Sequence, residues 1–481
     1  MDKYTYLFPF ESIPFKSKIL IYGAGDVGKE YLKQMLMTGY CQVLGFVDRR
    51  DNKQSMSFPI YLPDKIADIP FDYIVLAFKT RTTAEDVTYN LTKQGIKTSK
   101  IIFQEARAEI PIFDNYCESV DMLVNQEFAF CKSKISVAIK MGSALGDIII
   151  KKKLLLSLSL MEPKMLIDIY TPSGKERIQS IYSDFPQLNC VIEDGGAIYA
   201  AQQSKYGIAM TVFYMIIIDY INDESISESP HFFKKMKTHQ ERHKMYNLSN
   251  YPSHQNWIHF SRGKYYKMNC YSIYNYTNVF QITDWRVVIP FRDSYKKEYK
   301  NMDLISYITL NYGNGISSKG NKQSVSKQWP KEKFEEFVIK FKKKYPNIIV
   351  VQLGDQTAEK VRGVDKYVLG KSLELVKYIL KGAIFHLDIE GGLVHLASQI
   401  GTKCVVLFGP TSEEFFGYRN NINISFSKCS GCFCLYDNVY QCAREMERPE
   451  CMWSITPSIV LKKVEGYLNS LDVKSNINTL K

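Results

Sequence analysis

The chain has 481 residues, more than one hydrophobic core usually organises, so several domains are expected. Hydrophobic residues make up 45% of it and charged residues 23%, a composition that excludes a largely disordered protein. Its 62 basic and 50 acidic residues give a net charge of +12, which suits phosphorylated ligands or an anionic membrane surface. The charge is too dispersed to predict nucleic-acid binding. No apolar run reaches the roughly 20 residues that cross a bilayer, and the first residues do not resemble a secretory signal, so a cytoplasmic protein is expected.

The first segment has the pattern of a nucleotide-binding domain. A strand is predicted at 18–22, followed by the turn GAGDVG and a helix. Three glycines of this turn would permit a tight bend, a close approach of backbone amides to a phosphate, and close packing of helix on strand; they are Gly23, Gly25 and Gly28. A second strand, at 43–47, ends at Asp48, whose carboxylate could accept a hydrogen bond from a ribose hydroxyl. We predict a Rossmann-like domain at 1–110 that binds NAD or a nucleotide-sugar, or that serves as a docking module.

A second alternation of strands and helices follows a linker at 111–134. A strand is predicted at 135–141, then a glycine turn, then a helix that Asp147 opens. Glycine turns at the carboxyl ends of parallel strands are where open α/β sheets place ligands. We predict one domain at 135–304, which includes a basic and aromatic stretch at 202–276 whose organisation the sequence does not reveal.

The third segment, 305–481, has the strand–helix order of a doubly wound α/β sheet. A strand at 308–310 leads into a polar glycine loop, and Pro330 fits the first turn of the next helix, where its missing amide donor costs nothing. Further strands are predicted at 348–353, 384–387 and 404–408. This segment and the one before it are therefore expected to form two similar α/β domains.

Four landmarks in these two domains resemble glycosyltransferase family nine, the ADP-heptose:LPS heptosyltransferases. In chain order they are MGSALGDIII, KQWP, EGGLVHLASQIGTKCVVLFGPT and CMWSITPSIV. The resemblance covers about residues 135–471, and the first segment resembles the N-terminal domains of many polysaccharide-biosynthesis proteins. It implies a GT-B fold, in which two Rossmann-like domains face a cleft, with an additional Rossmann-like domain in front. It also implies an inverting enzyme that uses a nucleotide-sugar donor and no catalytic metal.

The resemblance assigns roles to particular residues. Asp147 matches the catalytic aspartate that takes the proton of the acceptor hydroxyl; the alternative is a helix N-cap or a first-turn carboxylate stabilised by the helix dipole. Lys327 matches a lysine that contacts the diphosphate, and would otherwise be a solvated loop residue. His395 would hydrogen-bond the phosphate or orient the loop, or be purely structural. The other expected donor-binding residues are Gln352, Asp355, Glu390, Gly391, Gly392 and Thr411.

One landmark departs from the family pattern. Glu390 stands where the family has an aspartate, and Gly391 where it has a threonine. The longer carboxylate could still bind sugar hydroxyls, but the change leaves the donor sugar open. An ADP-heptose-like donor is therefore an expectation at the level of the family.

Five of the 11 cysteines lie between positions 429 and 451, which in a reducing cytosol favours a metal clip over a disulfide framework. A CxxC pair with two later cysteines can surround one tetrahedral zinc or iron ion. Related protein-modifying heptosyltransferases carry a comparable cysteine finger. We expect a structural ion on Cys429, Cys432, Cys442 and Cys451, with Cys434 as a spare; the alternative is a set of buried free thiols.

We predict a glycosyltransferase that moves a heptose-like sugar to a glycan, lipid-linked or protein acceptor in lipopolysaccharide or capsule assembly, in the cytoplasm or peripherally at the inner face of the membrane. A different class is a nucleotide-sugar oxidoreductase or epimerase built on the first domain, which would need a helical Tyr-x-x-x-Lys pair. One such pair, at Tyr61, is interrupted by a proline, and the other, at Tyr89, leaves no room for a substrate lobe. A third class is a catalytically inactive protein that binds sugar nucleotides. The presence of Asp147, Lys327 and His395 argues against this class.

Overall fold

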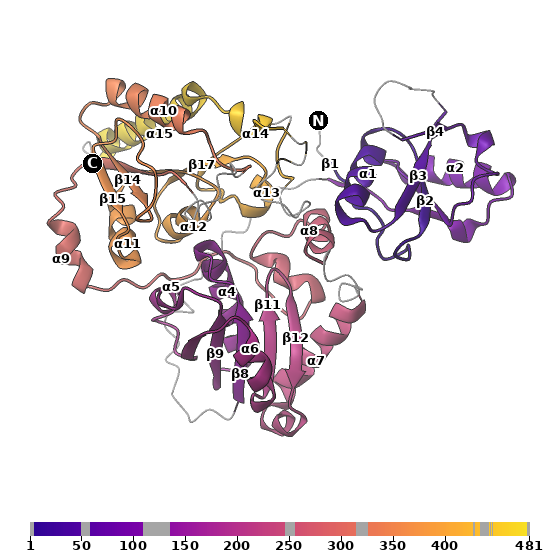
Figure 1. Ribbon diagram of the computed structural model, residues 1–481, viewed down its shortest axis with the longest axis horizontal. Coiled ribbons are helices and arrows are strands. Elements are labelled where there is room, and N and C mark those ends of the chain that lie inside the picture. The colour runs from indigo at the N-terminus through magenta and orange to yellow at the C-terminus, as the bar shows by residue number, and fades with distance from the viewer. Residues whose placement is uncertain are drawn as a thin grey trace. The chain divides into compact units, whose positions relative to one another are not determined.

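The computed structural model describes residues 4–49, 58–108, 135–245, 255–313, 326–426, 429–432, 442, 444 and 446–478. As far as they are described, Met1–Ile112 and Glu241–Met268 form one compact unit. Phe113–Gln240, Asn269–Phe433 and Asn438–Lys481 form a second. The chain is an α/β protein with one mainly parallel sheet in the first unit and two in the second (Figure 1). None of the described helices is both long and apolar enough to cross a membrane.

The sheet of the first unit has five parallel strands in the order β4-β3-β2-β5-β6. Its strands are β2 (Lys18–Tyr22), β3 (Gln42–Val47), β4 (Ile60–Tyr61), β5 (Tyr73–Leu76) and β6 (Ile101–Phe103). The first helices are α1 (Asp26–Thr38) and α2 (Arg81–Lys93), and a small antiparallel pair joins β1 (Tyr4–Thr5) to β7 (Arg107–Ala108). After the exposed Lys18, strand β2 is a run of buried apolar residues, as is typical of a parallel strand whose two faces are covered. The Rossmann-like fold predicted for this segment is confirmed.

A helix from a distant part of the chain also belongs to the first unit. Helix α8 (Gln255–Tyr265) packs against α1. Two of its apolar side chains, Ile258 and Phe260, are nearly fully buried. Whereas the sequence places this stretch in a domain at 135–304, the structure groups Glu241–Met268 with the N-terminal residues.

The first sheet of the second unit has the order β10-β9-β8-β11-β12, parallel except for β12. Its strands are β8 (Ile135–Met141), β9 (Met165–Thr171), β10 (Leu188–Glu193), β11 (Ile208–Val212) and β12 (Ile216–Ile221). Its helices are α4 (Leu145–Met161), α5 (Lys175–Ile181), α6 (Ala197–Gln202) and α7 (Pro230–Met245). Because α4 begins at Leu145, Asp147 lies in the first turn of the helix that it was predicted to open.

The second sheet of this unit has six parallel strands in the order β15-β14-β13-β16-β17-β18. They are β13 (Tyr307–Asn311), β14 (Ile349–Gly354), β15 (Lys366–Leu369), β16 (His386–Ile389), β17 (Cys404–Phe408) and β18 (Ile422–Ser425). The helices are α9 (Ser294–Lys300), α10 (Lys331–Lys344), α11 (Leu373–Gly382), α12 (Gly392–Gln399), α13 (Glu413–Phe416), α14 (Glu450–Trp453) and α15 (Pro457–Asn478). Pro330 is the N-cap of α10, one residue before the turn in which it was expected. Short 3₁₀ helices occur at Pro63–Lys65, Thr98–Lys100, Gln203–Lys205, Asp223–Glu228 and Ser272–Thr277.

The two sheets of the second unit are joined by buried polar contacts between their helices. The hydroxyl of Ser180 donates a hydrogen bond of 2.5 Å to Glu374, and the ammonium of Lys377 donates one of 3.0 Å to the Ser180 carbonyl. Helix α4 of the first sheet also contacts α12 of the second. This unit has the GT-B-like fold predicted from the sequence, and the Rossmann-like sheet of the first unit completes the predicted fold.

Candidate functional site

The N-termini of α4 and α12 meet in the second unit, and glycines make this approach possible. A Cβ atom on Gly146 would lie 2.8 Å from Cδ2 of His395, and one on Gly392 would lie 2.8 Å from Cβ of Leu145. Both distances are under the 3.0 Å that real Cβ contacts essentially never show. Because both positions are glycine, the first turn of α4, which contains Asp147, lies directly beside the first turn of α12.

Asp147 is held by two side chains and keeps a third of its surface exposed. The hydroxyl of Tyr214 donates a hydrogen bond of 3.2 Å to Oδ1, and the buried ammonium of Lys151 lies 3.7 Å from Oδ2. The side chain of Asp147 is 32% exposed. The N-cap of α4 is Ala144, so this carboxylate is not the N-cap of its helix. An oriented and accessible carboxylate is what a general base requires.

Lys327, Glu390 and His395 form a connected group, called here the Glu390 cluster. The Lys327 ammonium donates a hydrogen bond of 3.3 Å to the Glu390 carbonyl and lies 3.7 Å from its Oε2. The other carboxylate oxygen lies 3.3 Å from Nε2 of His395. Burial alone would raise the pKa of the Glu390 carboxyl, but Lys327 and His395 together hold that pKa below its usual value. The cluster therefore keeps a buried carboxylate ionised between a lysine and an imidazole.

The other nitrogen of His395 enters a chain of buried hydroxyl groups. Nδ1 lies 2.6 Å from the Tyr418 hydroxyl, which lies 2.8 Å from the Tyr271 hydroxyl. Gln399 donates a hydrogen bond of 2.9 Å to Tyr271. Burial is the largest cause that raises the pKa of Tyr418, so both tyrosines remain neutral hydroxyls. This chain fixes the ring orientation of His395, and sequence reasoning missed both tyrosines.

Two of the expected donor-binding residues use their side chains in local structure. Gln352 donates a hydrogen bond of 2.7 Å to the Glu359 carbonyl and accepts one of 2.8 Å from the Val361 amide. Asp355 accepts hydrogen bonds of 2.9 and 2.8 Å from the amide and the hydroxyl of Thr357. Among the described residues, neither side chain is hydrogen-bonded to the Glu390 cluster.

The remaining expected donor-binding residues lie near the start of α12 and after β17. Helix α12 begins at Gly392, and its N-cap is Gly391. Because glycine has no side chain, no side-chain hydrogen bond from the N-cap satisfies the first amides of the helix. The side chain of Thr411 is 1% exposed, and its hydroxyl has no hydrogen-bond partner within the described residues. Leaving such a buried hydroxyl unpaired costs about 1–3 kcal/mol, which a ligand could recover.

Asp388 lies within β16, and its side chain is buried. Asn311 donates hydrogen bonds of 3.1 Å to both of its oxygens, and Nε2 of His386 lies 3.4 Å from Oδ2. Burial raises the pKa of this carboxyl despite these partners. Asp388 is therefore a buried residue that braces the centre of the sheet.

The four cysteines expected as metal ligands include two buried thiols, Cys442 and Cys451, and two partly exposed ones, Cys429 and Cys432. Burial, followed by the charges of the other three sulfurs, raises the pKa of Cys451 to about 12. Within the part of the chain that the structure describes, no group of three or more His, Cys, Asp or Glu is arranged to hold a metal ion. The spare, Cys434, lies outside the described residues.

The glycine turn of the first unit has the geometry expected of its sequence. Gly23 has φ 112°, and a Cβ on Gly28 would lie 1.9 Å from the Gly23 carbonyl oxygen, so helix and strand pack at their closest. Gly25 is the N-cap of α1. Asp48 accepts a hydrogen bond of 2.9 Å from the Ala24 amide, so one of its oxygens holds the turn.

Comparison with solved structures finds proteins of low sequence identity. E. coli ADP-heptose LPS heptosyltransferase II is 14% identical over 70% of this chain and 100% of its own, with a TM-score of 0.44. A family 9 glycosyltransferase from Veillonella parvula is 13% identical over 71% of this chain and 99% of its own, with a TM-score of 0.43. TibC of enterotoxigenic E. coli, a dodecameric iron-containing heptosyltransferase solved with ADP-D-beta-D-heptose, is 14% identical over 70% of this chain and 77% of its own, with a TM-score of 0.45.

Comparison with family models is more specific. Residues 15–102 match the family C2185-like, N-terminal, and residues 314–448 match Glycosyltransferase family 9 (heptosyltransferase). No curated protein sequence matches the chain. The match at 314–448 contains Lys327, Glu390 and His395. The chain thus carries a domain of glycosyltransferase family 9, the heptosyltransferase family, behind a C2185-like N-terminal domain.

Proposed function

We propose that the second unit transfers a sugar from a nucleotide-sugar to an acceptor hydroxyl, with inversion at the anomeric carbon. The observation that supports this most directly is the contact between Gly146 and His395, which brings Asp147 beside the Glu390 cluster. A carboxylate of one sheet is thereby brought near an imidazole and a helix N-terminus of the other sheet, and Glu390 joins that imidazole to Lys327. These are the groups that a displacement with a nucleoside diphosphate leaving group requires.

Asp147 is the proposed base. It takes the proton of the acceptor hydroxyl while that oxygen forms a bond to the anomeric carbon. The bond from the anomeric carbon to the diphosphate oxygen breaks on the opposite face, so the configuration is inverted. The hydrogen bond from Tyr214 orients the carboxylate, and its exposed third admits the acceptor.

Positive groups of the second sheet stabilise the negative charge of the departing diphosphate. Lys327 supplies a cation, and the amides of Gly391 and Gly392 open the positive end of α12. We propose that these groups neutralise the leaving group without a catalytic metal. Glu390, which is ionised, can accept hydrogen bonds from hydroxyls of the donor sugar. The family match and the ADP-heptose bound to TibC support an ADP-heptose-like donor.

The acceptor is proposed to be a phosphorylated, lipid-linked glycan of surface-polysaccharide assembly at the inner face of the membrane, with other glycans and proteins as alternatives. In the second unit, helix α7 exposes two cations, Lys234 and Lys237. Together with the net charge of +12, this surface suits an anionic acceptor.

A thermal-shift and calorimetric screen of ADP-, GDP-, UDP- and CDP-sugars tests the function. We expect ADP-heptose to stabilise the protein most, by about 2.7 kcal/mol at 100 times its Kd. A protein that binds none of these donors would refute the proposal. Reduction of NAD⁺ during incubation with a nucleotide-sugar would instead support an oxidoreductase.

The same titration tests a second proposal, that the glycine turn of the first unit binds NAD or a nucleotide-sugar. Its support is the glycine N-cap of α1 and the position of Asp48, which follows β3 and contacts the glycine turn through the Ala24 amide. We expect a second equivalent of nucleotide that disappears in Asp48→Ala. A stoichiometry of one in the wild type would make this domain a docking module.

We further propose that Cys429, Cys432, Cys442 and Cys451 hold a structural zinc or iron ion. Their spacing in the sequence, a CxxC pair followed by two later cysteines, supports a common site, and thiolates are the ligands that such ions prefer. Elemental analysis should find about one zinc or iron per chain, and Cys451→Ser should lose it together with thermal stability. A wild-type protein without stoichiometric metal would leave these residues as free thiols.

A further inference from the structure

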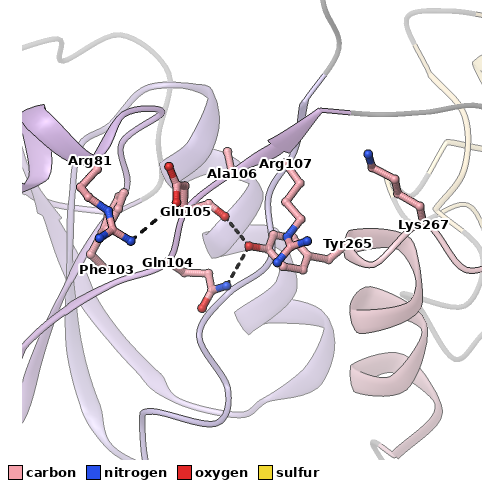
Figure 2. Close-up of a pocket in the computed structure, with 8 residues that line it drawn as sticks. All are labelled: Arg81, Phe103, Gln104, Glu105, Ala106, Arg107, Tyr265 and Lys267. Carbon is pink, nitrogen blue, oxygen red and sulfur yellow. Dashed lines mark hydrogen bonds and ion pairs between the residues drawn. The ribbon is translucent and has the colours of Figure 1, made fainter. Parts of the chain in front are cut away.

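A pocket of about 550 Å³ lies in the first unit, and none of its lining residues belongs to the candidate functional site. Its size is within the range of about 300–1,000 Å³ that is usual for small-molecule sites. The wall combines the first residue of α2, the segment from the end of β6 to the start of β7, and the C-terminal end of α8 (Figure 2). The pocket therefore exists only because α8 returns to the first unit.

Tyr265 fixes the two parts of this wall to each other. Its side chain is 2% exposed, and its hydroxyl accepts a hydrogen bond of 2.8 Å from Gln104 and donates one to the Glu105 carbonyl (Figure 2). The guanidinium of Arg107 lies over the ring, 5.1 Å from its centroid. The part of the wall around Tyr265 is thus preformed by contacts within the unit.

The lining is strongly positive. Three cations, Arg81, Arg107 and Lys267, contribute to it, against one carboxylate, Glu105, which lies 3.7 Å from Arg81. Arg81 also begins α2, whose N-cap makes no side-chain hydrogen bond and whose first turn has no acidic residue. The positive end of that helix adds to the same potential. An excess of two positive charges therefore lines the pocket.

Lys267 adopts a backbone conformation that is unfavourable for most residues other than glycine. Its φ is 59°, in the left-handed region. Hydrogen bonds from the Lys267 amide to the Lys264 carbonyl and from the Met268 amide to the Gly263 carbonyl close α8 in a Schellman motif, in which this position is usually glycine. Within the described residues, no hydrogen bond or ion pair engages the Lys267 ammonium. The fold thus holds a lysine where glycine would be more stable, and this lysine lines the pocket.

We propose that this pocket binds a phosphate monoester, either a sugar phosphate or a mononucleotide. Such a group carries about −1.5 to −2 charges at neutral pH, which matches the excess of two cations, whereas one carboxylate would leave a cation unmatched. The arginine forks of Arg81 and Arg107 suit phosphate oxygens, and Glu105 can accept a hydrogen bond from a ligand hydroxyl. This site is separate from both the sugar-transfer site and the glycine turn.

Calorimetric titration of the full chain with glucose 1-phosphate, AMP and glucuronate tests the proposal. Lys267→Gly removes the ammonium and relieves the backbone. It should weaken binding of both phosphates at least ~10-fold, while the melting temperature stays the same or rises. A preference for AMP over glucose 1-phosphate, lost in the same variant, would identify a nucleotide ligand, and the reverse preference a sugar phosphate.

Lys16→Gly is the matched control, because Lys16 belongs to the same unit, has a φ of 65° and does not line the pocket. This variant and Lys327→Ala should both bind glucose 1-phosphate like the wild type. The proposal is wrong if the wild type binds neither phosphate at millimolar concentration, or if Lys267→Gly binds both unchanged. Equal weakening by Lys16→Gly, loss of binding in Lys327→Ala, or equally tight binding of glucuronate would also overturn it.

Discussion

Replacing Asp147 with alanine should lower turnover at least ~100-fold and leave the affinity for the donor nearly unchanged. The size follows from the loss of a general base, which typically contributes about 10²–10⁴ to the rate. Donor affinity is spared because the groups proposed to bind the diphosphate belong to the other sheet, at Lys327 and the start of α12. Product formation measures turnover, and calorimetry measures donor binding.

Two further variants separate the base from its surroundings. Asp147→Asn keeps the size of the side chain and should be nearly as impaired as alanine, since it cannot take a proton. Tyr214→Phe removes only the hydrogen bond of 3.2 Å that orients the carboxylate, so it should be impaired much less. Full turnover in Asp147→Ala would remove this residue from the mechanism.

Lys327→Ala should impair both steps, raising the donor Kd and lowering turnover by about 10- to 100-fold each. A charge-assisted hydrogen bond contributes about 1.5–3 kcal/mol, and the lysine is proposed to contact the diphosphate before and during bond breaking. Its side chain is 21% exposed, and its ammonium is paired with Glu390. A donor affinity equal to that of the wild type would leave Lys327 with a structural role only.

The pH dependence of stability shows whether Lys327 and Glu390 are coupled. The pKa of Glu390 is depressed in the folded protein, so its contribution is present above the unfolded pKa of about 4.5 and is lost as the pH falls through the folded value. Lys327→Ala should therefore destabilise the protein most near neutral pH. The matched variant Lys327→Ala with Glu390→Gln should recover part of that loss, because it no longer leaves an unpaired buried charge.

The sequence predicts features that depend on local pattern. Short apolar runs become buried parallel strands, and β17 has the bounds expected for it, 404–408. The glycine turn before α4 likewise places Asp147 where the motif indicates. Such positions are predictable because the residues that determine strand ends and glycine turns are adjacent in the sequence.

Partners that are distant along the chain are not predictable in this way. Tyr214 lies 67 residues from Asp147, and Tyr271 lies 147 residues from Tyr418, so no local pattern links these hydroxyls to the site. Gln352 shows a different error, in which a residue predicted to bind a ligand has a structural role. A polar residue near a strand end suggests a ligand contact, but its amide supports a neighbouring loop.

The return of α8 to the N-terminal domain constrains how this protein can be made and cut. On the ribosome, the domain lacks a packing surface until residue 268 has emerged, more than 150 residues after its own sheet is complete. A fragment that stops at residue 112 would forfeit the burial of Ile258 and Phe260, about 1.5–3 kcal/mol for each. The proposed roles of the two units are therefore better separated by point variants, because truncation would expose the face of α1 that α8 covers.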